Sequence, residues 1–305
     1  MVNYGKFRDQ NQKKIKKDGD NNCDTKHDSM IERNSSFRRR TSSNSSLTKL
    51  TDLFVDLTVP KRWFRHFYVL GVLWVTFVTY ELLIVRDTND CLFVRLLRHF
   101  EDYYSTTISL SYQQPRGECV LALLMLQIQT TRRMFECFWV ERPSLDSKMH
   151  IGHYMVGITF YFMMGIAVWI EGSGWFLNTT FASVNEFLAI HIPFAIFLFI
   201  YASHHQHIQH KILASLRTSS SPRYSLPTGD WFDVMSSAHY FSEILIYISF
   251  VILTKAKNFT LWLALIATIF NLIQFAIDSY HWEHRVFKGD VKLQKKKWII
   301  IPFIY

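Results

Sequence analysis

From about residue 61 to its C-terminus the chain is a succession of apolar segments, most of them long enough to cross a lipid bilayer. A helix needs roughly 20 apolar residues to span the hydrocarbon core, and only helices or closed barrels satisfy their backbone hydrogen bonds there. The sequence therefore predicts an all-α, polytopic integral membrane bundle of about six spans. The expected spans are 67–85, 118–140, 151–170, 187–202, 240–254 and 259–277. Pro193 is expected to kink the fourth span.

The N-terminal part of the chain has a different composition. Residues 1–65 hold 15 of the 34 Lys and Arg residues, and residues 1–58 contain no sustained apolar run. Because such a composition buries too little apolar surface to fold, we expect 1–58 to be a disordered cytosolic tail and 59–305 to be the membrane domain. An amphipathic piece is expected near 91–100, after the first span.

The charge and the cysteines exclude some classes of protein. The net charge of +9 comes from the tail and from alternate loops rather than from one folded face, so it does not indicate nucleic-acid binding. The four cysteines have no CxxC or metal-ligand spacing, which argues against a disulfide framework and a zinc site. The sequence does not indicate an oligomeric state.

The distribution of basic residues also predicts the topology. Under the positive-inside rule, the segments 132–150, 203–239 and 278–305 lie on the cytosolic side with the tail. The loop at 171–186 has no Lys or Arg and contains the glycosylation pattern Asn178-Thr-Thr, as a lumenal loop would. The polar segments of interest thus meet at the cytosolic face, where soluble phosphorylated cofactors are found.

The stretch Pro227–Tyr247 carries an ionisable pair at the point where a polar loop enters an apolar helix. His239 and Glu243 are four residues apart and share one helix face. Ionisable side chains at such a boundary are costly to bury, which makes them functional candidates. The alternative is a helix end whose polar residues simply face water.

Two adjacent arginines, Arg132 and Arg133, interrupt the second span. Glu136 follows Arg132 by four residues, so partial neutralisation within the helix is available. Two arginines so close to an apolar run suggest a bound anion. An ordinary cytosolic stop signal is the alternative.

The chain has 13 histidines, several of them in the segment SHHQHIQHKILASLR at 203–217, which we expect to be a loop. HxxH pairs occur at 150/153, 207/210 and 281/284, which raises the possibility of a di-iron oxidase. Membrane di-iron enzymes use HxxxH and HxxHH boxes, and neither spacing occurs in this chain. We therefore predict no metal site, and the alternative for these histidines is a partly wet interfacial loop.

Five segments together resemble the steroid 5α-reductase family, and most of all its polyprenol reductase branch. They are VPKRWFRHFYVLGVLW (59–74), TTRRMFEC (130–137), SHHQHIQHKILASLR (203–217), GDWFDVMSSAHYFSEILIY (229–247) and IIPFIY (300–305). The segments follow the family's order, and the resemblance covers about residues 55–305.

The resemblance implies a multi-pass enzyme of the endoplasmic reticulum membrane with its active site near the cytosolic face. Its activity would be NADPH-dependent reduction of the α-isoprene double bond of polyprenol or polyprenal, a long-chain isoprenoid lipid, in the dolichol biosynthesis that supports protein N-glycosylation. The C-terminal half, 150–305, would hold NADPH. The residues that would contact the cofactor are Arg133, Gln206, His210, Arg217, His239, Glu243 and Trp282. A hydride would add to the β-carbon of an unsaturated carbonyl while an acid polarises its oxygen.

Three departures from the family pattern bear on this interpretation. The region where relatives have a further span before VPKR is polar in this chain, and Ala238-His239 replaces the usual Asn-containing pair. The C-terminal Tyr-Pro pattern is absent, so Tyr280 or Trp282 would replace the family's cofactor-contacting tyrosine. The family's Gln-Glu pair aligns near His66-Phe67, which leaves His66, with Tyr68 behind it, as the expected catalytic residues.

Two alternative functions stay open at this point. Steroid 5α-reduction uses the same chemistry, but His66 in place of the family's Glu disfavours it. A non-catalytic membrane relative would keep the fold and a binding role. The missing first span favours that alternative, whereas the two arginines and Glu243 argue against it.

Overall fold

The computed structural model describes residues 57–85, 91–103, 114–142, 147–173, 189–217, 225–287 and 297–301. Most of the expected disordered tail, residues 1–56, lies outside these ranges. The chain divides into two compact units, one with Met1–Trp63 and Pro143–Met155, the other with Phe64–Arg142 and Val156–Tyr305.

The first unit contains a two-stranded antiparallel ribbon. Strand β1 (Thr58–Pro60) pairs with β2 (Lys148–His150), and Val59 lies opposite Met149. Backbone hydrogen bonds continue on both sides of the ribbon, from Lys61 N to Ser147 O at 2.8 Å and from Ile151 N to Leu57 O at 3.0 Å. The sequence did not predict this ribbon, because strands of three residues are too short to show an alternating pattern.

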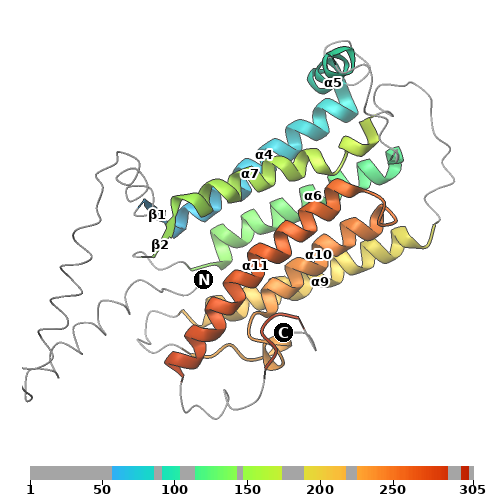
Figure 1. Ribbon diagram of the computed structural model, residues 1–305. Coiled ribbons are helices and arrows are strands. Elements are labelled where there is room, and N and C mark those ends of the chain that lie inside the picture. Colours follow the sequence, from blue (N-terminus) through green and yellow to red (C-terminus); the bar gives the residue numbers. More distant parts are fainter. Residues whose placement is uncertain are drawn as a thin grey trace, which may run out of the picture. The chain divides into compact units, whose positions relative to one another are not determined.

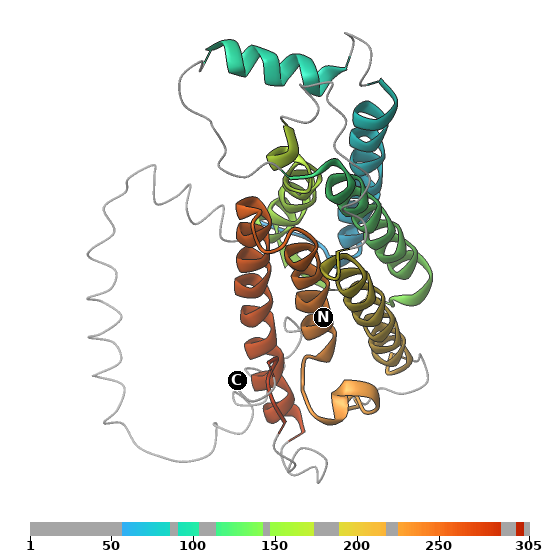
Figure 2. The ribbon, with the colours of Figure 1, turned by 90° about the vertical axis from the view of Figure 1, so that its right-hand side faces the viewer.

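The second unit is a bundle of helices, with α7 (Ile151–Ala167) entering it from the first unit. Its other long helices are α4 (Phe64–Tyr80), α6 (Arg116–Phe135), α9 (His191–Ser215), α10 (Ala238–Leu253) and α11 (Phe259–Val286). The amphipathic helix α5 (Leu92–Tyr103) lies where the sequence predicts it. Helix α4 packs against α6, and α10 packs between α9 and α11 (Figures 1 and 2).

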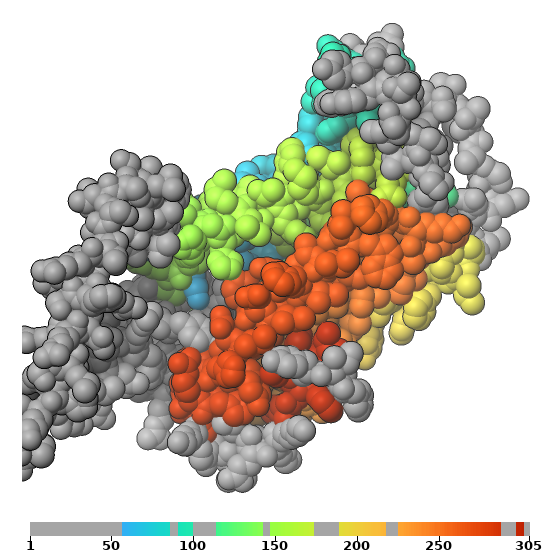
Figure 3. All heavy atoms as spheres, viewed as in Figure 1, coloured from blue at the N-terminus to red at the C-terminus, as the bar shows by residue number. Residues whose placement is uncertain are grey.

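The fold class is the predicted one, an all-α membrane bundle. Three helical stretches, Lys61–Val85, Ile151–Gly172 and Phe259–Val286, are long and apolar enough to cross a membrane. They correspond to the first, third and sixth expected spans. Helix α11 lies at the surface of the bundle (Figure 3). Its large apolar side chains Phe259, Ile266 and Phe270 are exposed, as on a lipid-facing helix.

Helix α9 corrects two expectations. It continues to Ser215, so most of the segment at 203–217 is helix rather than loop. Gln206, Gln209 and His210 recur at helical spacing and are buried, so packing extends the helix beyond its apolar half. Pro193 lies in the first turn of α9, where its missing N–H would have had no partner in any case, so it starts the helix instead of kinking it.

The end of the bundle where α6 and α11 begin is closed by buried polar side chains. The Glu171 carboxylate accepts hydrogen bonds from the backbone N of Thr260 at 2.7 Å and of Phe259 at 3.2 Å. It therefore caps the positive N-terminal end of α11. Asn258 donates from Nδ2 to Gln114 Oε1 at 2.7 Å, which ties the same turn to the chain just before α6.

Close contact between α4 and α7 depends on glycine. A Cβ at Gly165 would collide with the indole of Trp74, whereas a Cβ at Gly71 would meet its nearest neighbour at 3.5 Å. The indole cannot move away freely, because its Nε1 donates to Phe162 O at 2.9 Å and its ring stacks on the Phe162 ring.

We therefore expect Gly165→Ala to destabilise the protein by about 1–3 kcal/mol, the usual cost of overpacking. Gly71→Ala is the matched control, and it should be neutral or slightly stabilising because alanine favours helix. Thermal unfolding in detergent measures both. Equal melting temperatures for the two variants would show that this helix contact has room for a methyl group.

Candidate active site

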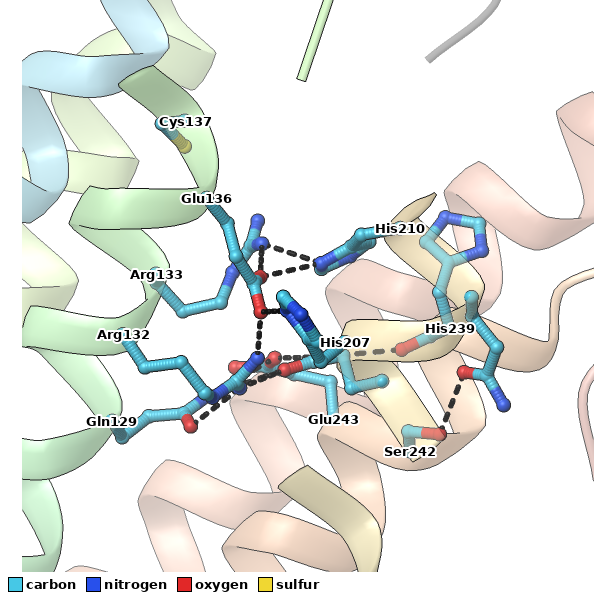
Figure 4. A network of polar contacts seen from close by, with 12 residues as sticks. Gln129, Arg132, Arg133, Glu136, Cys137, His207, His210, His239, Ser242 and Glu243 are labelled. Carbon is cyan, nitrogen blue, oxygen red and sulfur yellow. Dashed lines mark hydrogen bonds and ion pairs between the residues drawn. The ribbon is translucent and has the colours of Figure 1, made fainter. Parts of the chain in front are cut away.

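The C-terminal end of α6 carries a buried carboxylate with two arginines. Glu136, the first residue of the π-helical turn η3 (Glu136–Val140), has a side chain only 2% exposed. Arg132 and Arg133 both bond to it (Figure 4). Buried charges are stable only when paired and hydrogen-bonded. The predicted i,i+4 pair thus exists, and Glu136 is a counter-charge that the two arginines share.

Two histidines of α9 complete the surroundings of Glu136. His207 Nδ1 lies 2.8 Å from Glu136 Oε1, and His210 Nδ1 lies 2.7 Å from Oε2. His210 Nδ1 is also 2.6 Å from Arg133 Nη1. Since Nδ1 donates in one tautomer and accepts in the other, His210 bonds to Glu136 when Nδ1 carries the hydrogen and to Arg133 when it does not. The imidazole therefore lies between an anion and a cation of the cluster.

Arg133 extends the cluster towards α4 and the residues after η3. Its Nη2 donates to Glu141 Oε1 at 2.9 Å, and its Nε donates to the Tyr68 hydroxyl oxygen at 3.3 Å. The guanidinium also lies over the Tyr68 ring, 4.9 Å from its centroid. Burial alone would raise the pKa of Glu141, but the Arg133 charge outweighs it and holds that pKa below its usual range. Glu141 therefore stays ionised as a second counter-charge to Arg133.

A second group of contacts joins α9 to α10 around Glu243. Gln206 donates from Nε2 to the Glu243 carboxylate and, at 3.4 Å, to the His239 carbonyl. Its Oε1 accepts from Arg132, so Gln206 links the two groups of contacts. Gln129 Nε2 also donates to Glu243 Oε2 at 3.4 Å. Glu243 thus lies in a network of amide donors at a helix boundary, as a carboxylate that loses hydration requires.

Asp230, in the short helix η6 (Asp230–Asp233), holds the outer turns of α9 in place. Its two carboxylate oxygens lie 2.6 Å from His205 Nδ1 and 2.6 Å from Gln209 Nε2. The Trp231 ring stacks on His205, with 4.4 Å between the centroids. Gln209 in turn accepts from Ser242 Oγ of α10 at 2.8 Å. These contacts fix α9 against α10 and so position Gln206.

The structure brings together most of the residues predicted from the sequence. Arg133, Gln206, His210 and Glu243 lie in one connected cluster, and the His239 carbonyl bonds to Gln206. Arg217 follows α9, is exposed and donates to the Arg142 carbonyl at 2.9 Å. Trp282 is buried on α11 with its ring against Phe287.

The two expected catalytic residues differ in their placement. Tyr68 is buried and reaches the cluster through Arg133. His66 lies two residues earlier on α4 and is half-buried. Residues two apart do not share a helix face, so the structure presents Tyr68 to the cluster rather than His66.

Members of the site that the sequence analysis missed include Gln129, Glu141, His207 and Asp230. His207 belonged to a noted HxxH pair, but the prediction of a loop at 203–217 left it without a partner. Gln129 lies one turn before Arg133 and could have been found from helical spacing. In the part of the chain that the structure describes, no group of three or more His, Cys, Asp or Glu is arranged to hold a metal ion.

Some buried polar atoms near the cluster have no hydrogen-bond partner among the described residues. They are Arg132 Nε, His239 Nδ1 and the hydroxyl of Ser237, the residue before α10. Buried polar atoms are normally paired, so these atoms mark places where a bound molecule would complete the hydrogen bonding. Guanidinium, imidazole, amide and carboxylate groups together suit a ligand that carries both anionic and amide groups.

Comparison with known proteins identifies the family. The profile of the 3-oxo-5-alpha-steroid 4-dehydrogenase family matches residues 147–305, a little over half of the chain. The chain belongs to this family. Its matched part includes α9, η6 and α10, which carry Gln206, His207, His210, Asp230 and Glu243.

Curated relatives in this family are similar over most of their length. The polyprenal reductase of Xenopus tropicalis is 31% identical over 258 residues, which cover 81% of this chain and 80% of the relative. The polyprenal reductase of Mesocricetus auratus is 29% identical over 266 residues, or 81% of this chain and 79% of the relative. Polyprenal reductase 1 of Oryza sativa subsp. indica is 26% identical over 306 residues.

The pairing of Glu136 leads to a stability prediction. Glu136→Ala leaves Arg132 and Arg133 without their common counter-charge, so we expect a loss of about 3–5 kcal/mol, the cost of breaking a buried ion pair. Glu141→Ala is the control. The Glu141 side chain is 30% exposed, and among the described arginines it pairs with Arg133 alone. In Glu141→Ala, Arg133 keeps Glu136 as a counter-charge, so the loss should be smaller than in Glu136→Ala. Denaturation in detergent compares the two, and equal losses would contradict the central role of Glu136.

Proposed function

We propose that this protein is an NADPH-dependent reductase of the α-isoprene double bond of polyprenal in dolichol biosynthesis, in the endoplasmic reticulum membrane. The observation that carries the proposal is the similarity to polyprenal reductases over about four fifths of the chain. The protein is an oxidoreductase that acts on a carbon–carbon double bond, and its substrate is an isoprenoid lipid. The polar cluster inside a membrane bundle supports this, because a membrane enzyme of a lipid needs a polar site next to apolar surface.

The residues at the site fit a nicotinamide dinucleotide. Arg133 would bind a phosphate by charge-assisted hydrogen bonds, and Gln206 and His210 would line the nucleotide. His239 Nδ1, which is buried without a partner in the described chain, and Glu243 would receive the carboxamide as donor and acceptor. Arg217, exposed at the end of α9, would contact the phosphate that distinguishes NADPH, and Trp282 would pack against the cofactor. When bound, the cofactor supplies a hydride.

The chain itself must supply a hydrogen-bond donor for the carbonyl oxygen. Tyr68 would fill this role, with His66 as the second candidate. The Tyr68 hydroxyl oxygen accepts a hydrogen bond from Arg133 Nε, and this would strengthen Tyr68 as a donor to the oxygen where negative charge develops. The surrounding apolar residues, including Phe67 and Tyr161, exclude water from this side of the site.

The topology of the proposed enzyme follows from the helix ends. The cluster lies at the ends of α6 and α9 and at the start of α10, all of which the positive-inside rule assigns to the cytosolic side. Six spans with both termini in the cytosol would result, and NADPH would reach the site from that side.

A direct test is complementation of a dolichol-deficient strain, followed by lipid analysis. We expect dolichol to be restored, and the purified protein to reduce the α-isoprene double bond of polyprenal with NADPH. The family profile carries the name of a steroid activity, so a 3-oxo-Δ4 steroid is assayed in parallel. If only the steroid is reduced, a steroid and not polyprenal is the substrate. If neither compound is reduced, the protein is a non-catalytic relative.

Glu243→Gln tests the proposed orientation of the nicotinamide. The substitution keeps the size of the side chain but exchanges an acceptor for a donor, and a small misplacement of reacting atoms costs on the order of a hundredfold in rate. We expect turnover per molecule to fall by that factor while protein abundance in microsomes is unchanged. Asp278→Asn, on the exposed face of α11, is the control for the exchange of acid for amide. Normal turnover of Glu243→Gln with reduced abundance would make Glu243 a structural residue.

A further inference from the structure

A groove of about 630 Å³ runs along the outer face of α6 and η3, beside the polar cluster. Its walls include Ile128, Phe135, Trp139 and Val140. The first three of these are exposed, with Ile128 at 56% and Trp139 at 71%. The volume falls within the range of about 300–1,000 Å³ that is typical of small-ligand sites. The groove extends over residues 127–140, or roughly 20 Å of helix at 1.5 Å per residue.

Polar side chains lie at the middle of the groove. Arg132, Glu136 and His207 line it, and all three also belong to the cluster. The Arg132 side chain is 20% exposed and that of His207 is 35% exposed, whereas Glu136 is almost fully covered. Arg132 and His207 thus reach the groove, with Glu136 behind them. A molecule in the groove would contact the cluster through these two side chains.

The positive charge of Arg132 in the groove is already balanced by Glu136. Arg132 and His207 both bond to Glu136 Oε1, so the groove contains no unpaired cation among its lining residues. A phosphate-headed lipid would bring a negative charge that has no counter-charge in this low-dielectric surrounding. A neutral oxygen, by contrast, can accept a hydrogen bond from Arg132 without displacing Glu136. His207 donates from Nδ1 to Glu136, which leaves Nε2 of the neutral ring as an acceptor.

We propose that this groove is the entry site for the isoprenoid lipid substrate, with its chain along Ile128, Phe135 and Trp139 and its oxygen towards Arg132, before the carbonyl group moves to Tyr68. The proposal rests on the proposed function and adds the place where the lipid is taken from the bilayer. The walls are apolar and face outward, so a chain longer than the groove continues into the surrounding lipid. Only the isoprene units near the oxygen contact the protein here.

The test fills the groove with a larger side chain. Ile128→Trp should raise KM for long-chain polyprenal at least tenfold while KM for NADPH is unchanged, because it removes space for the lipid and leaves the cluster intact. Ile266→Trp on α11 is the matched control, since Ile266 is 57% exposed and lies outside the groove. It should leave both constants at their wild-type values. An unchanged polyprenal KM in Ile128→Trp, with the variant melting like wild type, would overturn the proposal.

Photolabelling gives a readout that does not depend on turnover. A diazirine-bearing polyprenol in detergent–lipid micelles should label the peptide that contains Ile128 and Trp139. Unlabelled polyprenol should compete with this labelling, phosphatidylcholine should not, and Ile128→Trp should reduce it. Equal competition by phosphatidylcholine would show that ordinary bilayer lipid fills the groove, which also overturns the proposal.

The two measurements separate failure of the groove from failure of the proposed function. Absence of polyprenal turnover in the wild-type protein, with specific photolabelling retained, would reject the reductase activity and keep the isoprenoid-binding groove. Normal wild-type turnover without labelling of this peptide, and with an unchanged KM in Ile128→Trp, would keep the reductase and reject the groove.

Discussion

The carboxylate of Glu136 is the interaction on which the polar site depends. Two adjacent arginines in an apolar helix would be very costly to bury alone, and Glu136 lies one turn further along the same helix, where it can pair with both. Its oxygens also receive His207 and His210 from α9. The buried carboxylate of Glu136 therefore joins η3 to α9, and the charged groups around it are paired before any ligand binds.

This internal pairing decides how ligands can bind. Arg133 is already neutralised by Glu136 and Glu141, so an anionic group that binds it must exchange places with one of these carboxylates. The surroundings of Glu243 are different, because its partners Gln206 and Gln129 are neutral amides. A carboxamide can join that network without displacing a charge. The site thus has a part suited to phosphate and a part suited to an amide, joined through Gln206.

The two faces of α6 serve different purposes in the bundle. Its inner face carries Gln129 and Arg133 towards α9, α10 and Tyr68, and these contacts are charged or hydrogen-bonded. Its outer face carries Ile128 and Phe135 along the groove, where apolar surface is exposed. Arg132 lies between the two faces and belongs to both. Helix α6 therefore separates a polar compartment from a lipid-accessible one, and Arg132 together with His207 of α9 connects the two.

The sequence by itself determined the features that depend on local spacing. Apolar runs of sufficient length predicted the membrane bundle, and an i,i+4 relation predicted the Arg132–Glu136 pair. Only the tertiary structure decided which helix faces meet. His210 lies 74 residues from Glu136, and Tyr68 lies 65 residues from Arg133. A helical repeat fixes which side chains share a face, but the partner of that face is set by packing between distant segments. For the same reason the sequence left 203–217 as a loop, since its polar residues find their partners on η3, η6 and α10, which lie far away in the chain.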